Sequence, residues 1–278
     1  MIKYFAFLNL LFFIVSCNSS KIFYDYGDII ISWQVDNYFD LTSEQEEWIE
    51  GKIISHLDWH QKKELPDYKI FLVDIQEMAK NGISMKDLDI GFSNFETKRD
   101  NLFNRLIPDI AFFLTNLSSD QIDFFEEKIL KENLEIQEEL DNKQDLLNKK
   151  KEKFFEQMEN WFGELSEYQI SQLSKWQNQW YKDSFYTSKD RIKFRLESQK
   201  QFLSILRSYP KKEEMEDWLR KWTLSWVSSS TPKRKKRILR NKKRIIKVDK
   251  ILTNEQRFHA LKEIDYWIKV VDETIENY

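Results

Sequence analysis

Residues 118–162 read SSDQIDFFEEKILKENLEIQEELDNKQDLLNKKKEKFFEQMENWF, without a single Gly or Pro. The apolar residues of this stretch recur at spacings that are sums of three and four, which is the period of one helix face. The residues that follow this spacing are Ile122, Phe125, Ile129, Ile136, Leu140, Leu147, Phe154, Met158 and Trp161. One unbroken helix would extend about 65 Å at 1.5 Å per residue. Because this length exceeds the globular norm, a break near Asp141 and Asn142 is the competing interpretation.

The composition of the whole chain agrees with this helical pattern. Only five Gly and four Pro occur among 278 residues, which excludes sandwiches, barrels and doubly wound sheets, since these folds need Gly and Pro at many turns. Hydrophobic residues make up 41% and charged residues 33%, a balance typical of long helices with solvated outer faces. We therefore predict an all-α fold, an extended multi-helix bundle with one or more long helices.

The remaining helices are expected at 42–64, 66–80, 93–115, 166–187, 189–208, 211–228, 233–250 and 253–276. Pro66 suits the first turn of its helix, where a missing amide donor costs nothing, so Glu64 and Leu65 are expected to form a hinge before it.

The N-terminus carries a different signal. Its apolar run, Tyr4 to Val15, is too short for a transmembrane helix and is typical of a signal peptide. The following sequence, Ile14 to Cys17, resembles a bacterial lipobox. This resemblance implies a lipoprotein signal peptide at 1–16, lipidation of Cys17, a lipid anchor and tether at 17–40, and a helical periplasmic domain at 41–278. A non-lipidated secretory signal, or a single odd thiol, is the alternative.

Two further expectations follow from this region. Asn18 rather than Asp follows Cys17, so in a Gram-negative host the lipoprotein sorting rule implies the periplasmic face of the outer membrane. Because Cys17 is the only cysteine, a disulfide framework and a zinc-thiolate site are excluded. Residues 18–40 are also rich in apolar and aromatic side chains, so packing on the body is an alternative to a free tether.

Four short motifs share the pattern Leu, Ser or Thr, two variable residues, and Gln. They are LTSEQ at 41–45, LSSDQ at 117–121, LSEYQ at 165–169 and LTNEQ at 252–256. This spacing is that of a capping box, in which the hydroxyl accepts from the N3 amide and the Gln side chain reaches back to the N-cap. Each motif therefore predicts a helix N-terminus, and the irregular intervals argue against a solenoid. The string also resembles the LTxxQ signature of the periplasmic Spy and CpxP proteins, which implies a chaperone or stress-regulatory role; helix capping alone is the other interpretation.

A second resemblance extends over nearly the whole mature chain. The pattern WxxDxYxxLTxxQ, carried here by Trp33, Asp36, Tyr38, Leu41, Thr42 and Gln45, is followed by Trp59, His60, Glu64, Leu65, Pro66 and Tyr68. Later blocks include Trp161, Gly163, Leu165 and Gln169, then Leu252, Thr253, Gln256 and Arg257. Together they resemble an uncharacterised bacterial lipoprotein family, a domain of unknown function. Gln61 stands where that family usually has Arg, and Phe39 separates Tyr38 from Asp40. The family supplies no activity.

Two surfaces are candidates for binding. Trp218, Trp222 and Trp226 recur every four residues and share one helix face, which predicts either core or a partly exposed apolar groove for a client segment. Residues 233–250 hold eleven basic residues and one acidic residue, among them Lys235, Lys236, Lys242 and Lys243. An amphipathic helix docked on an acidic body is one interpretation, and binding of anionic headgroups or other envelope polyanions is the other. Export makes nucleic acid a poor partner.

Catalytic and cofactor motifs are not found in the sequence. No nucleophile elbow, phosphate loop or dinucleotide fingerprint occurs, so we expect no enzyme and no cofactor. His56 and His60, four residues apart, are weak metal candidates; Leu57 stands where a zinc protease needs Glu. Alternatively Trp59, His60 and Glu64 join the first helix to its neighbours.

These observations predict a non-catalytic, lipid-anchored envelope protein that binds clients in a chaperone-like way. The alternative is a structural or regulatory adaptor whose basic helix binds envelope polyanions; a hydrolase with an unrecognised site is a third hypothesis.

Overall fold

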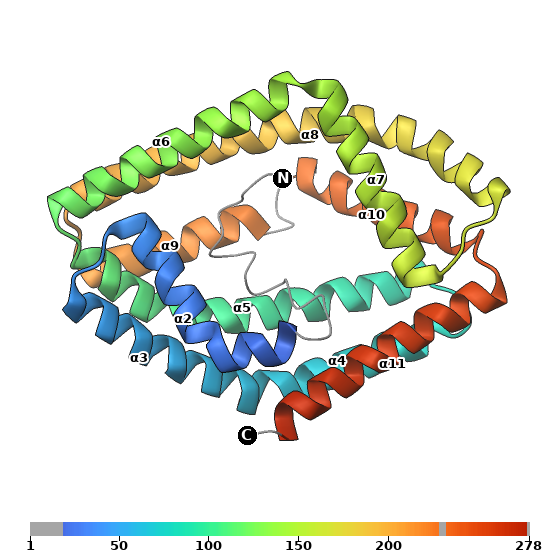
Figure 1. Ribbon diagram of the computed structural model, residues 1–278, viewed down its shortest axis with the longest axis horizontal. Coiled ribbons are helices and arrows are strands. Elements are labelled where there is room, and N and C mark those ends of the chain that lie inside the picture. The colour runs from blue at the N-terminus through green and yellow to red at the C-terminus, as the bar shows by residue number, and fades with distance from the viewer. Residues whose placement is uncertain (1–18, 228–231, 277–278) are drawn as a thin grey trace.

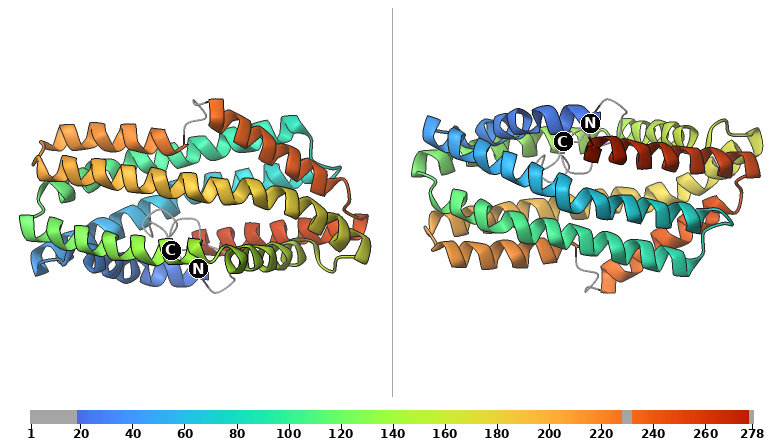
Figure 2. Two further views of the ribbon diagram at one scale, coloured as in Figure 1. Left: turned by 90° about the horizontal axis from the view of Figure 1, so that it is seen from above. Right: turned by 90° about the horizontal axis from the view of Figure 1, so that it is seen from below.

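All regular structure in residues 19–227 and 232–276, the part of the chain described by the computed structural model, is helical, which confirms the all-α prediction. The elements are α2 (Ser19–Phe39), α3 (Ser43–Trp59), the π-helical turn η1 (His60–Glu64), α4 (Leu65–Ala79), α5 (Met85–Thr115), α6 (Ser119–Asp141), α7 (Lys143–Phe162), α8 (Glu167–Arg207), α9 (Lys212–Val227), α10 (Pro232–Asp249) and α11 (Asn254–Glu276). They form an oval frame when viewed down the shortest axis of the molecule (Figure 1). Figure 2 shows that α2 and α7 lie toward one broad face, and α9 and α10 toward the other.

The same order of elements occurs twice along the chain. In the first repeat, residues 19–141, α2 precedes a long helix (α3, η1 and α4), a middle helix (α5) and a last helix (α6). In the second repeat, residues 143–276, α7 precedes the long helix α8, the middle pair α9 and α10, and the last helix α11. Both last helices have 23 residues. The last helix of each repeat packs on the long helix of the other, α6 on α8 and α11 on α4 (Figure 1).

The hinge predicted at Glu64 and Leu65 is wrong, because the helix continues from α3 into α4. The Leu65 N–H donates to the carbonyl of His60, five residues back, so one extra residue is accommodated in a π-helical turn. Pro66 has no N–H, and its ring would collide with the carbonyl four residues earlier in a regular α-helix. The wider turn removes that clash without ending the helix.

Two more predicted helix boundaries are wrong. The helix expected from residue 93 begins at Met85, because Ser84 and Asp87 form a capping box of their own: the Ser84 hydroxyl accepts from the Asp87 N–H at 3.2 Å. The break expected between residues 187 and 189 does not occur, since α8 runs without Gly or Pro to Arg207. The alternative of a break in 118–162 is confirmed. Asn142 leaves the helical region, with φ −87° and ψ 65°, and its side chain accepts from the Asp145 N–H to begin α7.

The largest core lies between α2, α3, α5, α6, α8 and α9. It contains Val35, Ile49, Ile53, Phe103, Ile107, Ala111, Phe113, Leu114, Leu117, Ile122, Phe125, Ile129, Leu206, Met215 and Leu219. Smaller clusters join α7 to α8 and α4 to α11. Helix α2 contributes buried Tyr24 and Val35, so from Tyr24 onward this segment packs on the body, which was the alternative to a free tether. Within the described ranges, none of the helices combines the length and apolar character needed to cross a bilayer.

Candidate functional site

All four motifs are helix N-caps, as predicted. The hydroxyls of Thr42, Ser118, Ser166 and Thr253 each accept from the N–H of the motif Gln at 3.2–3.3 Å, and each Gln side chain accepts in return from the N-cap N–H. Two donors that would otherwise lack a partner at a helix start are thereby satisfied.

The motif glutamines also pair with one another across the molecule. In the first junction, formed by residues 41–45 and 117–121, the Gln121 amide donates to Gln45 Oε1 at 2.6 Å and Gln45 donates back at 3.2 Å. Gln121 also donates to the carbonyl of Asp40, the residue before the partner motif, at 3.1 Å, and Gln45 lies 3.5 Å from the Asn116 carbonyl. Each glutamine thus caps its own helix and also contacts a backbone carbonyl just before the partner motif.

The second junction, formed by residues 165–169 and 252–256, repeats this arrangement. Gln169 donates to Gln256 Oε1 at 2.6 Å and to the Ile251 carbonyl at 2.7 Å. Gln256 donates to Gln169 Oε1 at 2.9 Å and to the Glu164 carbonyl at 2.8 Å. The irregular motif intervals are therefore explained by two pairs, with partner glutamines 76 and 87 residues apart, one pair closing each repeat.

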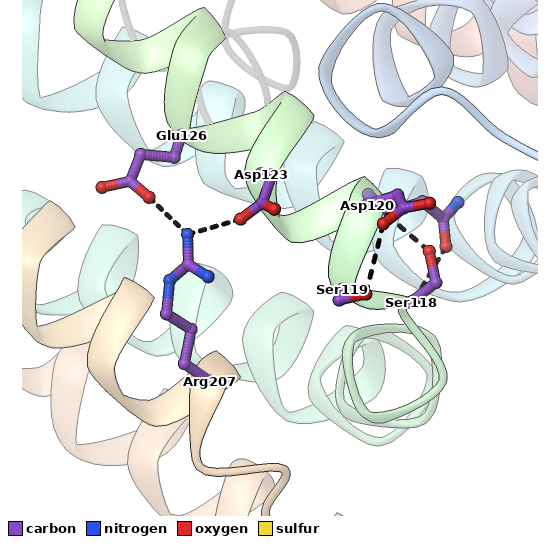
Figure 3. A network of polar contacts seen from close by, with 7 residues as sticks. Ser118, Ser119, Asp120, Asp123, Glu126 and Arg207 are labelled. Carbon is purple, nitrogen blue, oxygen red and sulfur yellow. Dashed lines mark hydrogen bonds and ion pairs between the residues drawn. The ribbon is translucent and has the colours of Figure 1, made fainter.

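The long helix of the second repeat ends beside the first junction. Figure 3 shows Arg207 of α8 between Asp123 and Glu126 of α6, one to two turns beyond the Ser118 cap. The guanidinium lies 2.7 Å from Asp123 Oδ1 and also pairs with Glu126. These side chains are exposed and screened by solvent, so the pairs contribute little to the free energy of unfolding.

An apolar cavity of about 250 Å³ lies within the largest core. Its walls come from α2, α3, α5, α6, α8 and α9, and most of its lining side chains are aliphatic or aromatic. They include Val35, Phe39, Trp48, Ile49, Ile53, Leu57, Leu106, Ile107, Ile110, Phe113, Leu114, Phe125, Phe202, Leu219 and Trp222. A cavity of about 150 Å³ with such a lining stays dry and takes up apolar molecules, so this larger one suits an apolar guest.

A small polar group stands at one side of this cavity. Asp109 of α5 lies 2.9 Å from Lys52 Nζ and 3.1 Å from His56 Nε2, both on α3. Burial lowers the pKa of His56, although the Asp109 carboxylate opposes that shift. His60 hydrogen-bonds the Tyr24 hydroxyl of α2 at 2.6 Å, and burial lowers its pKa to about 4. Both rings are therefore neutral at pH 7, and the Lys52 and Asp109 charges offset each other.

The structure does not bring the two histidines to a shared metal position. His56 faces Asp109, whereas His60 faces Tyr24 and packs edge-on against Tyr68. Among the described residues, no cluster of three or more His, Cys, Asp or Glu side chains has the geometry to hold a metal ion. The expectation that His60 joins the first helix to its neighbours is met through its hydrogen bond with the Tyr24 hydroxyl of α2. Glu64 is buried, and burial raises its pKa.

The aromatic face of α9 is divided between core and cavity. Trp218 is half-buried, with its ring stacked between Phe202 and Trp222 at centroid distances of 5.4 and 5.6 Å. Trp222 lines the cavity. The side chain of Trp226 is not among those described. Of the two tryptophans whose side chains are described, Trp218 therefore packs on the largest core and Trp222 lines the cavity.

The basic helix α10 docks on the body through part of its charge. Of the four lysines considered, Lys235, Lys236 and Lys243 are exposed and Lys242 is buried. The Lys242 ammonium lies 2.7 Å from Asp89 and 4.8 Å from the Phe92 ring of α5. Lys247 lies 4.1 Å from the Trp176 ring of α8. Helix α10 therefore docks on the body, and Lys242 is one of the residues that make this contact.

Comparison with known proteins identifies a family but no activity. Residues 37–227 match the model of a family of unknown function, DUF6279. The chain belongs to this family. No curated protein and no solved structure matches the chain. The DUF6279 match includes the first three motifs and ends before the fourth, at 252–256. Cys17 lies outside both the matched and the described residues.

Sequence reasoning named several residues that line the cavity of this DUF6279 chain, among them His56, His60, Phe125 and Trp222, but did not predict the cavity itself. The segment that forms α2 was expected as a tether, with packing on the body as the alternative, and the described part of α2 forms a wall of the cavity. The Lys52 and Asp109 pair was not considered. Their spacing in the sequence gives no sign of proximity. The apolar residues of α2 were the signal for its packing on the body, since a free tether does not need them.

Proposed function

We propose that this protein is a non-catalytic lipoprotein, anchored through Cys17 at the periplasmic face of the outer membrane, which binds apolar segments of client proteins in a chaperone-like way. The observation that carries the binding proposal is the apolar cavity. The cavity of about 250 Å³ is preformed, and its few polar groups are paired or neutral. An apolar side chain can therefore enter without leaving a buried charge unpaired.

A cavity-filling variant tests the binding. Ile110→Trp places a large ring into the cavity from α5, and Leu57→Trp does so from α3. Both variants should lose binding of the neutral dye N-phenylnaphthylamine and suppress aggregation of an unfolded model protein less well. Overpacking costs about 1–3 kcal/mol, so urea melts identify the variant that stays folded.

The matched control is Leu239→Trp, which adds the same ring at an exposed position of α10, away from the cavity lining. This variant should behave as wild type. Undiminished dye binding and aggregation suppression by a folded, cavity-filled variant would contradict the proposal.

The anchor is tested separately. Cys17→Ser should remain uncleaved and should take up no labelled acyl chain, whereas the wild-type chain is cleaved and labelled. Equal acyl labelling of both proteins would refute lipidation at Cys17.

The second candidate function is an adaptor for envelope polyanions, favoured by the exposure of Lys235, Lys236 and Lys243 on α10. Changing these three lysines to Gln should abolish binding to anionic vesicles or lipopolysaccharide while the melting temperature stays unchanged. Dye binding in the cavity should persist, which separates the two functions. Wild-type protein that ignores anionic surfaces at low salt would rule out the adaptor.

A further inference from the structure

Helix α2 presents an apolar stripe to solvent. Tyr26, Ile29, Ile30 and Trp33 are between 36% and 62% exposed. Their spacing of three, four and seven residues places them along one helix face. The opposite face packs on the body, with Tyr24, Gly27, Ser32 and Val35 buried. Because that side is fixed, the stripe cannot turn inward, and four large apolar side chains remain on the surface.

The second repeat shows that the fold does not require such a stripe. Helix α7 occupies the corresponding place, before the long helix of its repeat, and lies toward the same broad face as α2 (Figure 2). The outward positions of α7 are mostly charged: Lys151, Glu152, Lys153, Glu156 and Glu159 are all exposed. An apolar outer surface is therefore a property of α2 itself, and contiguous exposed apolar residues mark interaction surfaces.

The position of α2 in the chain indicates what covers the stripe. The helix begins at Ser19, two residues after Cys17. If Cys17 carries the lipid, as proposed above, the stripe starts within ten residues of the membrane surface. Trp and Tyr are the side chains that favour the boundary between headgroups and acyl chains, and a helix with one apolar face lies in that boundary.

We infer that the Tyr26, Ile29, Ile30 and Trp33 face of α2 lies in the interface of the membrane to which the chain is anchored. The inference rests on the proposed lipidation of Cys17. This placement of α2 fixes the orientation of the body relative to the membrane, since α2 packs against α3 and α6. Helices α9 and α10, on the other broad face, then point away from the anchoring membrane (Figure 2). The exposed lysines of α10 would face polyanions across the periplasm rather than the lipids of the same leaflet.

Photo-crosslinking in cells tests this placement with the full chain. Benzoylphenylalanine replaces Trp33 in one variant and Leu239, an exposed apolar residue of α10, in the other. Metabolic labelling with an acyl chain reports lipidation in the same samples. We expect both variants to be acylated, and irradiation to add the mass of a phospholipid to the residue 33 variant only.

Each other outcome overturns the inference in a distinguishable way. Acylated protein without a phospholipid adduct at residue 33, or with equal adducts at both residues, refutes the interfacial helix but leaves the anchor intact. A protein adduct at residue 33, from another protein or a second copy of this chain, shows that the stripe is a protein interface. Absence of acylation removes the anchor, and the inference with it.

Discussion

The two junctions have the same hydrogen-bond arrangement but different surroundings. In the first junction Gln45 is half-buried, and its contact with the Asn116 carbonyl is long, at 3.5 Å. In the second junction Gln169 and Gln256 are both buried, and the carbonyl contacts are 2.7 and 2.8 Å. The comparison teaches that the motif supplies the groups that meet at a junction, whereas burial decides how much their hydrogen bonds stabilise the fold.

The largest expected effect comes from an ion pair beside the second junction. Asp249 Oδ1 lies 2.5 Å from Arg257 Nη1, and Asp249 Oδ2 accepts from the Ile83 N–H at 3.2 Å. Asp249→Ala leaves the largely buried Arg257 guanidinium without its carboxylate and the Ile83 amide without an acceptor. This loss should lower the free energy of unfolding by about 3–5 kcal/mol in urea melts. Arg207→Ala, at the exposed pairs of the first junction, should change the free energy of unfolding much less, because solvent screens these charges. Similar losses in both variants would contradict the assigned difference in burial.

The glutamines themselves give the next largest effect. Gln169→Ala removes one amide that serves the Ser166 cap, Gln256 and the Ile251 carbonyl, all in a buried setting. We expect a loss of about 3 kcal/mol, against about 1 kcal/mol for Gln45→Ala, because buried groups left unsatisfied are the costly ones.

A double-mutant cycle over Gln169 and Gln256 should give a larger coupling energy than the same cycle over Gln45 and Gln121. Gln169→Glu is a useful control, since it keeps the acceptor for the Ser166 N–H but loses the donor to Gln256 and to the Ile251 carbonyl. Equal coupling in the two cycles would mean that burial does not distinguish the junctions.

A pH effect should distinguish the first repeat, because the π-helical turn with His60 has no counterpart in the continuous helix α8. Burial lowers the His60 pKa from 6.5 to about 4. Between these values the unfolded chain binds the proton and the folded chain does not, so stability falls as pH drops below 6.5. At pH 5 the loss should be about 2 kcal/mol.

His60→Gln keeps a partner for the Tyr24 hydroxyl and does not titrate. The difference between wild type and this variant isolates the histidine from Glu64, whose raised pKa acts in the opposite direction. A difference that stays constant from pH 7 to pH 5 would refute the neutral, buried state of His60.

The smallest effect is expected at the caps, and there the two junctions should agree. Replacing Thr42, Ser118, Ser166 or Thr253 by Ala removes one hydroxyl acceptor and should cost about 0.5–2 kcal/mol in denaturant melts, with aggregation suppression unchanged. Unchanged stability together with lost client binding would instead make the motifs recognition elements.

Local features of this protein were readable from the sequence because each depends on neighbouring residues. Periodic apolar residues and scarce Gly and Pro predicted the all-α fold, and the four motifs predicted four helix starts. Asn142, with a side chain able to cap, marked the break between α6 and α7 as an alternative. The start of α5 was missed only because Asp87, rather than Gln or Glu, completes the box at Ser84.

Tertiary structure alone decided which of these local features meet. Gln45 pairs with Gln121, and Gln169 with Gln256, although all four carry the same motif and no spacing rule selects the partners. Lys242 looked like its neighbours Lys235, Lys236 and Lys243 until Asp89 and Phe92 of α5 buried it. The cavity arises where six helices from both repeats converge, and each helix alone shows only an apolar face. The physical reason is range: capping and periodicity act within one or two turns, whereas pairing, burial and cavity shape depend on chain segments dozens of residues apart.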